Sequence, residues 1–235
     1  MSVDASPIFV TGCTRSGKTL VAAILNKHPE LHITFESQIY TGTFRKWSYD
    51  LRKHGADPRS SFKEKILGRI ARLGISEEEL TQCIEDGEGS WEAMYDRYMR
   101  LVISKNKPAA TRWGDKTPVD AGTSSMILSH YPKAQFVYLY RDPRDTVSSM
   151  SLPDYTPCGN NHLINADVYD QYLREYSKEI YREGLNILRV RYETLVENPA
   201  EGVENICNFL GIDFCTPTFP ARQAPRDAGA RKAIY

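Results

Sequence analysis

The chain has 235 residues, 41% of them hydrophobic, which is enough for one compact domain with a sizeable core but short for two complete domains. We therefore expect a single domain over residues 1–235. Lysine plus arginine and aspartate plus glutamate both number 30, so the formal net charge is zero. This excludes a protein drawn to nucleic acid or to an anionic membrane by its overall charge. A site for an anion has to be built locally.

The amino-terminal residues and the cysteines indicate the compartment. Residues 1–7 are mostly polar, and the apolar run at 8–10 is too short for the core of a signal peptide. No stretch approaches the roughly 20 apolar residues of a membrane span. The cysteines are odd in number and lack CxxC spacing, which argues against a disulfide framework and against a structural zinc site. They are Cys13, Cys83, Cys158, Cys207 and Cys215. We expect a reduced, cytoplasmic protein without a membrane span.

Strand and helix patterns alternate along the chain. A short apolar run at 7–12 ends in glycine and is followed at once by a helical pattern at 19–27. Further strands are predicted at 32–35, 109–113, 135–140 and 186–191, and further helices at 117–131, 142–150, 166–183 and 199–210. The run at 135–140 is continuous in aromatic and β-branched residues, as expected when helices cover both faces of a parallel sheet. This order predicts a three-layer α/β fold with a mostly parallel sheet of about five strands.

The segment at about 60–107 differs from the rest because it contains charged helical patterns and no convincing strand. Ser76 followed by three glutamates is typical of a capped helix start. We interpret this segment as a helical insertion beside the site. The tail at 216–235, rich in proline, alanine and arginine, is predicted to be irregular.

Residues 12–19 read Gly-Cys-Thr-Arg-Ser-Gly-Lys-Thr and satisfy the pattern GxxxxGK(S/T) between a predicted strand and a predicted helix. The glycines let the backbone curl so that several N–H groups and the positive helix end face one phosphate, while Lys18 and Thr19 add a charge and a hydroxyl. The segment predicts an anion-binding loop in a P-loop-type fold. An ordinary turn with an exposed arginine and lysine is the alternative interpretation.

By itself, this loop is also typical of magnesium-dependent kinases and nucleotide hydrolases. Such enzymes normally need an acidic residue at the end of an apolar strand to hold magnesium. Here the strand at 135–140 runs into Arg141 before Asp142, and Arg144 follows, so the strand end is cationic. A nucleotide-binding regulatory protein without catalysis is a second alternative. Magnesium dependence and turnover would separate these classes.

Three blocks of sequence together resemble the sulfotransferase family, whose members share the P-loop fold and use 3′-phosphoadenosine 5′-phosphosulfate (PAPS) as donor. The blocks are TRSGKTL at 14–20, VYLYRDPRDTVSS at 137–149, and LRVRYETLV at 188–196 followed by Asn198-Pro199 and FLGI at 209–212. The first block is similar to the 5′-phosphosulfate loop of the family, with Arg15 as its basic residue. The second is similar to the 3′-phosphate block, with Arg141 and Ser149 as phosphate ligands.

The resemblance implies a set of donor-binding residues and no requirement for a metal. These residues are Arg15, Ser16, Gly17, Lys18, Thr19, Leu20, Arg141, Ser149 and Tyr192. Lys18 departs from the family, which usually has threonine or serine at this position, and it completes the nucleotide-hydrolase pattern.

The likeness is closest to the tyrosylprotein and bacterial branch of the family. In that branch a glutamate beyond the loop is the catalytic base, and Glu36 matches it. Lys116, within the run Trp-Gly-Asp-Lys-Thr-Pro, matches a lysine that contacts the transferring sulfonate. The resemblance therefore implies that Glu36, Arg15 and Lys116 are catalytic.

The chemistry of sulfonate transfer explains why such residues are needed. The reaction is an in-line displacement in which negative charge builds on the oxygen that bridges sulfur and the departing phosphate, so cations aimed there lower the barrier. Arg15 offers a planar fork of donors, and Lys116 a compact charge. Glu36 would accept the proton of the attacking hydroxyl, for a gain of roughly 10²- to 10⁴-fold.

Each of these residues also has a structural interpretation that the sequence leaves open. Glu36 could be a solvated acid at a strand end, and Lys116 could form a surface ion pair with Asp115. Tyr192 could pack in the core rather than near the donor.

A hydroxyl acceptor is expected beside Glu36, among the residues after it, the helical insertion and residues 151–164. A glycan, a peptide tyrosine, a lipid head group and a small metabolite all fit the sequence, which specifies neither the acceptor nor the oligomeric state. Seven polar or aromatic side chains of these segments either contact the acceptor or, as we expect for most of them, belong to the core. They are Ser37, Gln38, Tyr40, Trp47, Trp91, Tyr95 and Tyr98.

Overall fold

The structure is a computed structural model that describes residues 6–37, 39–40, 53, 55, 57–117, 121–152, 161–180 and 186–214. All residues predicted to be catalytic or donor-binding fall within these ranges. Gln38, Trp47 and the tail at 216–235 lie outside them.

Five strands form one parallel sheet. They are β1 (Ile8–Gly12), β2 (Leu31–Phe35), β3 (Arg112–Lys116), β4 (Gln135–Tyr140) and β5 (Ile187–Arg191). Their spatial order is β2-β3-β1-β4-β5, and every neighbouring pair is parallel. The predicted α/β fold with a parallel sheet of about five strands is confirmed.

The central strand β1 is buried on both faces. Ile8 and Val10 pack in one hydrophobic cluster with residues of α1 and α10. Phe9 points to the other face, where its ring stacks on Phe136 of β4 with 5.5 Å between the ring centroids. Because successive side chains of a strand point to opposite faces, a continuous apolar run such as 8–10 requires a layer of helices on each side.

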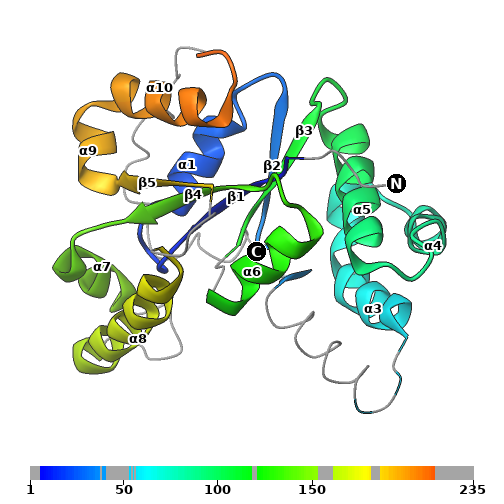
Figure 1. Cartoon of the computed structure of the whole chain (residues 1–235), viewed down its shortest axis with the longest axis horizontal. Coiled ribbons are helices and arrows are strands. Elements are labelled where there is room, and N and C mark those ends of the chain that lie inside the picture. The colour runs from blue at the N-terminus through cyan, green and yellow to red at the C-terminus, as the bar shows by residue number, and fades with distance from the viewer. Residues whose placement is uncertain are drawn as a thin grey trace.

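Helices provide these two layers, as Figure 1 shows. One face of the sheet is covered by α1 (Lys18–Leu25), α9 (Tyr192–Glu197) and α10 (Pro199–Leu210), and the other by α6 (Ala121–His130), α7 (Pro143–Met150) and α8 (His162–Ile180). Among the described residues, no helix has the length and apolar character needed to cross a membrane.

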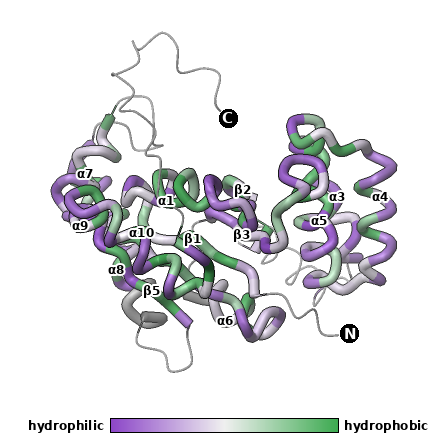
Figure 2. The backbone as a smooth tube through the Cα atoms, turned by 90° about the horizontal axis from the view of Figure 1, so that it is seen from above, coloured by the Kyte–Doolittle hydropathy of each residue, from purple (hydrophilic) through white to green (hydrophobic). Residues whose placement is uncertain are grey.

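A separate group of helices lies between β2 and β3 in the chain and beside β3 in space (Figure 1). It consists of α3 (Pro58–Ile70), the 3-10 turn η2 (Ala71–Leu73), α4 (Glu77–Glu85) and α5 (Trp91–Asn106). Ser76 caps α4 in a reciprocal capping box with Glu79, as its sequence predicts. Hydrophilic and hydrophobic residues both occur along α3, α4 and α5 (Figure 2).

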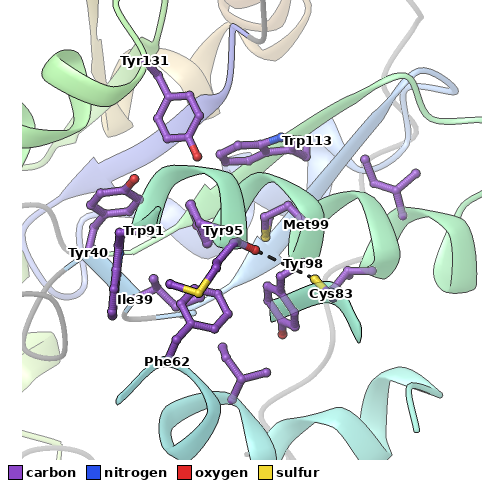
Figure 3. Packing of buried hydrophobic residues seen from close by; sticks show 14 of the residues in the cluster. Ile39, Tyr40, Phe62, Cys83, Trp91, Tyr95, Tyr98, Met99, Trp113 and Tyr131 are labelled. Atoms are coloured by element: carbon purple, nitrogen blue, oxygen red, sulfur yellow. Dashed lines mark hydrogen bonds between the residues drawn. The ribbon is translucent and has the colours of Figure 1, made fainter. Parts of the chain in front are cut away.

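The hydrophobic residues of these helices pack around aromatic rings (Figure 3). The ring of Trp113 on β3 lies 5.1 Å from Tyr95 of α5 and 5.5 Å from Tyr131, measured between centroids. Phe62 of α3 meets Trp91 of α5 in the same way, at 5.3 Å. The packing joins the helical group directly to β3, the strand next to the edge strand β2.

The predicted bounds of one strand are wrong. β3 begins at Arg112 and ends at Lys116, rather than covering 109–113. The second half of β3 lacks the apolar residues typical of a strand and was therefore not predicted as one, yet Gly114, Asp115 and Lys116 are all buried. At Gly114 an added Cβ would lie 2.6 Å from the carbonyl oxygen of Ile8, so glycine allows β3 to approach β1 closely.

Three helices also differ from their predicted ranges. α6 is described as Ala121–His130, compared with the predicted 117–131; Thr117 is not helical, and residues 118–120 lie outside the described ranges. α8 begins at His162 rather than at 166, because the side chain of Asn161 accepts hydrogen bonds from the N–H groups of Leu163 and Ile164. The short helix α9 was not predicted and follows β5 without a loop.

Candidate active site

The predicted site residues gather at the carboxyl edge of the sheet. The loop at 12–17 follows β1, Glu36 follows β2, Lys116 ends β3, Arg141 follows β4 and Tyr192 follows β5. β1 and β4 are adjacent, and the chain leaves them for helices on opposite faces of the sheet (Figure 1). Open parallel sheets bind ligands at such a switch point.

The loop after β1 has the backbone of an anion-binding loop. Gly12, Arg15 and Gly17 have positive φ angles of 137°, 68° and 103°, and an added Cβ at Gly12 would lie only 2.2 Å from the carbonyl oxygen of Leu139. The loop thereby turns directly into the positive end of α1. The buried hydroxyl of Ser16 has no hydrogen-bond partner among the described residues, which leaves it available to a ligand of the loop.

Lys18 is buried and turned back onto the loop. Its ammonium donates to the carbonyl oxygens of Gly12 at 2.6 Å and Cys13 at 2.7 Å. Burial lowers the pKa of Lys18 from 10.5 to about 8; neighbouring Cys13 and Glu36 oppose this shift, and Lys116 reinforces it. An anion at the loop would therefore favour the charged form of Lys18.

The other two residues of the motif lie in the first turn of α1. The side chain of Thr19 is exposed, and the partly buried Leu20 packs against the hydrophobic cluster that contains Ile8 and Val10. Only the backbone of Leu20 is thus well placed to face a ligand of the loop.

Glu36 and Lys116 form an ion pair beside the loop. The ammonium of Lys116 donates to Glu36 Oε1 at 2.7 Å, and the backbone N–H of Glu36 donates to the carbonyl oxygen of Lys116 at 2.8 Å. The Lys116 side chain is 7% exposed and that of Glu36 is 40% exposed, so the carboxylate is the more accessible partner of the pair. The ammonium also lies 5.3 Å from the centre of the Phe35 ring, which is half exposed.

Arg15 connects the loop after β1 to the segment after β4. Its Nε donates to the hydroxyl of Ser149 on α7 at 2.8 Å, and its carbonyl oxygen accepts from Arg141 Nη1 at 3.4 Å. Arg141 and Ser149, eight positions apart in the sequence, are thus brought together around Arg15. Arg141 Nε is buried without a hydrogen-bond partner among the described residues. This cluster is a second place where cationic and hydroxyl donors converge.

Tyr192 packs between the two segments. The guanidinium of Arg141 lies 4.6 Å from the centre of its ring, a distance typical of a cation–π contact. At Gly17 an added Cβ would lie 2.4 Å from Cδ2 of the same ring. The ring therefore holds Arg141 against the loop.

The acid nearest the end of β4 stabilises a helix. Asp142 caps α7 by accepting from the N–H of Arg144 at 2.9 Å, and it pairs with the exposed guanidinium of Arg144 at 2.8 Å. Nowhere in the described part of the chain are three His, Cys, Asp or Glu side chains grouped in a way that could hold a metal ion.

A surface ion pair between Lys116 and Asp115, one of the structural alternatives, is wrong. Both residues are buried, at 5% and 2% exposure. Asp115 accepts hydrogen bonds from uncharged groups, and Tyr95 is one of its donors. A buried carboxylate that follows a tryptophan and a glycine gives no local signal of its partners, so sequence reasoning missed it.

Most side chains considered for the acceptor belong to the core. The described members of that set are 5% exposed or less, as was expected for most of them; they are Ser37, Tyr40, Trp91, Tyr95 and Tyr98. Sequence reasoning instead missed Arg69 of α3, whose guanidinium donates to the carbonyl oxygen of Glu36. Nothing in a helical pattern could indicate this contact, because the two residues lie 33 positions apart in the chain and meet only when it is folded.

Known sulfotransferases are similar to this chain in sequence. The chain is 27% identical over 219 residues to a protein-tyrosine sulfotransferase of Drosophila melanogaster, an alignment that covers 88% of this chain and 38% of the relative. The alignments with this relative and with two others, from Caenorhabditis briggsae and Gallus gallus, cover 38%, 66% and 51% of the lengths of these relatives. The chain thus spans about half the length of the curated relatives it matches.

Solved structures show the same fold. The sulfotransferase domain from the curacin biosynthetic pathway superimposes with a TM-score of 0.59 at 18% identity, over 90% of this chain and 75% of that domain. A mouse sulfotransferase solved in complex with adenosine 3′,5′-bisphosphate (PAP) superimposes with a TM-score of 0.50 at 17% identity, over 90% of this chain and 60% of the mouse chain. A model of the Sulfotransferase family matches residues 7–216. With the loop, the sheet order and this match over most of its length, the chain belongs to the Sulfotransferase family.

Proposed function

We propose that this chain is an enzyme that transfers a sulfonate group from PAPS to a hydroxyl acceptor. The observation that carries the proposal is the hydrogen bond between Arg15 and Ser149. It joins an anion-binding loop to a second cluster of donors around Arg141. PAPS carries two separate anionic groups, a 5′-phosphosulfate and a 3′-phosphate, whereas the phosphates of ATP form a single chain. Two adjoining anion sites therefore favour PAPS.

The unpartnered atoms at the two sites support this donor. Ser16 Oγ in the loop and Arg141 Nε after β4 are buried without hydrogen-bond partners among the described residues. Buried polar atoms are rarely left unsatisfied, because doing so costs about 1–3 kcal/mol. In this proposal, Ser16, Gly17, Lys18 and Thr19 bind the 5′-phosphosulfate, the last through its N–H and hydroxyl. Arg141 and Ser149 bind the 3′-phosphate.

Glu36 and Lys116 are the proposed groups for the transfer step. The acceptor oxygen forms a bond to sulfur while the bond between sulfur and the bridging oxygen breaks. The electron pair of that bond leaves with adenosine 3′,5′-bisphosphate (PAP), and the acceptor proton passes to Glu36. Lys116, with Arg15, counters the charge on the bridging oxygen. The 2.7 Å contact between Glu36 and Lys116 keeps both groups at one point before the substrates bind.

Magnesium-dependent phosphoryl transfer is the alternative that Lys18 favours. The contacts of two residues, Lys18 and Asp142, speak for sulfonate transfer instead. The ammonium of Lys18 bonds to the carbonyl oxygens of Gly12 and Cys13, and the acid nearest the end of β4, Asp142, is engaged with Arg144 and the first turn of α7.

The acceptor proposed first is a tyrosyl side chain. Curated relatives from the fly and from the chicken are named protein-tyrosine sulfotransferases. A phenol also suits a carboxylate base, because its pKa of about 10 is far below that of an alcohol. A peptide tyrosine is therefore the first acceptor to test, ahead of glycans and lipid head groups.

Calorimetric titration tests the donor. PAP and ATP are each titrated into the protein, with and without magnesium. We expect PAP to bind without metal and ATP to bind weakly under both conditions. Magnesium-dependent binding of ATP without binding of PAP would overturn the proposal in favour of a kinase or hydrolase. Release of PAP from PAPS in the presence of a tyrosine-containing peptide then tests the transfer itself.

A further inference from the structure

Asp115 is a carboxylate in the interior of the protein that is surrounded by hydrogen-bond donors. It is 2% exposed. Oδ1 accepts from the Thr34 hydroxyl at 3.1 Å and from the Ser37 N–H at 3.2 Å. Oδ2 accepts from the Tyr95 hydroxyl at 3.1 Å, from the Thr117 hydroxyl at 2.7 Å and, at close range, from the Ser37 hydroxyl. These five donors compensate the carboxylate for the water it has lost.

Two of the residues that donate to Asp115 lie on either side of Glu36 in the sequence. Thr34 lies two residues before Glu36 and Ser37 one residue after it. The parallel register of β2 and β3 pairs Thr34 with Asp115 and Phe35 with Lys116, so Asp115 directly precedes Lys116 on β3, and its carboxylate bonds to residues on both sides of Glu36. It binds both the strand that enters the Glu36 turn and the residue that leaves it.

Glu36 itself has an unfavourable backbone conformation. Its φ angle is +52°, in the left-handed region that residues with a Cβ seldom occupy. Such a conformation persists only where the surroundings hold it, and it is common at functional sites. Three contacts hold it: the N–H of Ser37 donates to Asp115, the N–H of Glu36 donates to the carbonyl oxygen of Lys116, and the guanidinium of Arg69 donates to the carbonyl oxygen of Glu36.

We propose that Asp115 is a positioning residue that fixes the Glu36 turn and thereby sets the carboxylate of Glu36 against Lys116. The effect of Asp115 on catalysis rests on the proposed function. Its effect on the structure of the turn rests on the contacts alone. Asp115 does not reach the reacting atoms. One of the hydrogen bonds to Asp115 comes from Tyr95 of α5, so this carboxylate also links the helical group to the carboxyl end of β3.

An asparagine is nearly the same size as an aspartate but cannot accept all five hydrogen bonds, because its amide nitrogen is a donor. In the Asp115→Asn variant we expect kcat with PAPS and a tyrosine-containing peptide to fall roughly 10²-fold, the loss typical of a small misplacement of a catalytic group. The affinity for PAP should be unchanged, because the donors to Asp115 are Thr34, Ser37, Tyr95 and Thr117, none of which is a proposed donor-binding residue.

The matched control is Asp96→Asn. Asp96 is also a buried carboxylate, 4% exposed, and it accepts from Trp113 Nε1 at 2.9 Å and from Arg100 Nε at 2.6 Å. It lies on α5 near the same strand, and both of these hydrogen-bond donors lie outside residues 34–37. This variant should lose thermal stability while its kcat stays at the wild-type value.

A double-mutant cycle with Glu36→Gln separates positioning from general damage. If Asp115 acts through Glu36, Asp115→Asn has no further effect on kcat once Glu36 is glutamine. An equal loss in both backgrounds would overturn the proposal. Where Asp115→Asn does not yield folded protein, Ser37→Ala removes one donor, and the same cycle expects a smaller loss of kcat that again disappears in the Glu36→Gln background.

A crystal structure of the Asp115→Asn variant decides the proposal independently of turnover. We expect the φ angle of Glu36 to leave the left-handed region and the contact with Lys116 to lengthen beyond hydrogen-bonding distance. An unchanged turn would overturn the positioning role even if the chain is a sulfotransferase. Absence of turnover in the wild-type protein, together with a displaced turn in the variant, would instead sink the proposed function and leave the positioning role standing.

Discussion

The carboxylate of Glu36 accepts a hydrogen bond from the ammonium of Lys116 at 2.7 Å, although 80 positions separate the two residues in the chain. The strands that carry them, β2 and β3, are neighbours in the sheet, and the residues stand at the same edge. Each group satisfies the charge of the other; in the proposed mechanism, the substrates separate them. The donor would then engage Lys116, and the acceptor hydroxyl would engage Glu36.

The first prediction concerns Glu36 as the base. The variant Glu36→Gln keeps the size of the side chain but removes its ability to take a proton, so kcat should fall roughly 10²- to 10⁴-fold. PAP affinity, measured by calorimetry, should remain at the wild-type value. Glu201→Gln, on an exposed position of α10, is the control and should have no effect. Unchanged turnover in Glu36→Gln would remove this residue from the mechanism.

The second prediction concerns the 3′-phosphate. Arg141→Ala should weaken the binding of PAP by a factor of ten or more, roughly the 1.5–3 kcal/mol of a hydrogen bond to a charged group. The binding of adenosine 5′-monophosphate, which has no 3′-phosphate, should change little. Arg144→Ala is the control, because its side chain is 90% exposed and pairs with Asp142. An equal loss of affinity for both nucleotides would contradict the assignment of Arg141.

The third prediction uses the pKa of Lys18, which burial lowers to about 8. A bound anion favours the charged ammonium and raises this pKa, so binding of PAP near pH 8 should be accompanied by uptake of a proton. The affinity should then decrease as the pH rises above about 8. Calorimetry in two buffers with different ionisation enthalpies measures the uptake, and Lys18→Met should abolish it. The same uptake in both proteins would assign the proton to another group.

The same shift predicts a dependence of stability on pH. The pKa of Lys18 in the folded protein lies below the value of 10.5 expected in the unfolded chain. Between these values the unfolded chain binds more protons, so the contribution of Lys18 to the free energy of unfolding rises with pH from about 8 to 10.5. In Lys18→Met this rise should be smaller, as chemical denaturation at a series of pH values would show.

The fourth prediction concerns the close approach of β3 to its neighbours. In Gly114→Ala the new methyl group would lie 2.6 Å from the backbone oxygen of Ile8 and 2.5 Å from Cδ1 of Ile33. The strands would have to separate, at a cost of about 1–3 kcal/mol. Gly68→Ala on α3 is the control, since no atom lies within 4 Å of its added Cβ, and it should stabilise the protein by about 0.5–1 kcal/mol. Denaturant unfolding of both variants gives the comparison.

Local signals in the sequence predicted the parts of the fold that depend on neighbouring residues. The glycines and the basic residues at 12–19, the capping pattern at Ser76 and the apolar run of β4 each act within a few positions. For this reason their elements were found close to their observed bounds. The likeness of three blocks to a family then predicted donor-binding residues, because those blocks match the segments of the family that bind the donor.

The sequence by itself thus determined the order of strands and helices, the anion-binding loop and the cationic end of β4. Only the tertiary structure decided that Glu36 meets Lys116, that Arg15 joins Ser149, and that the polar residues of β3 form a buried strand. These contacts join side chains far apart in the chain. A hydrogen-bond partner supplied by another strand or helix leaves no trace in local composition, so the pairing of Asp115 with the Glu36 turn became visible only in the folded protein.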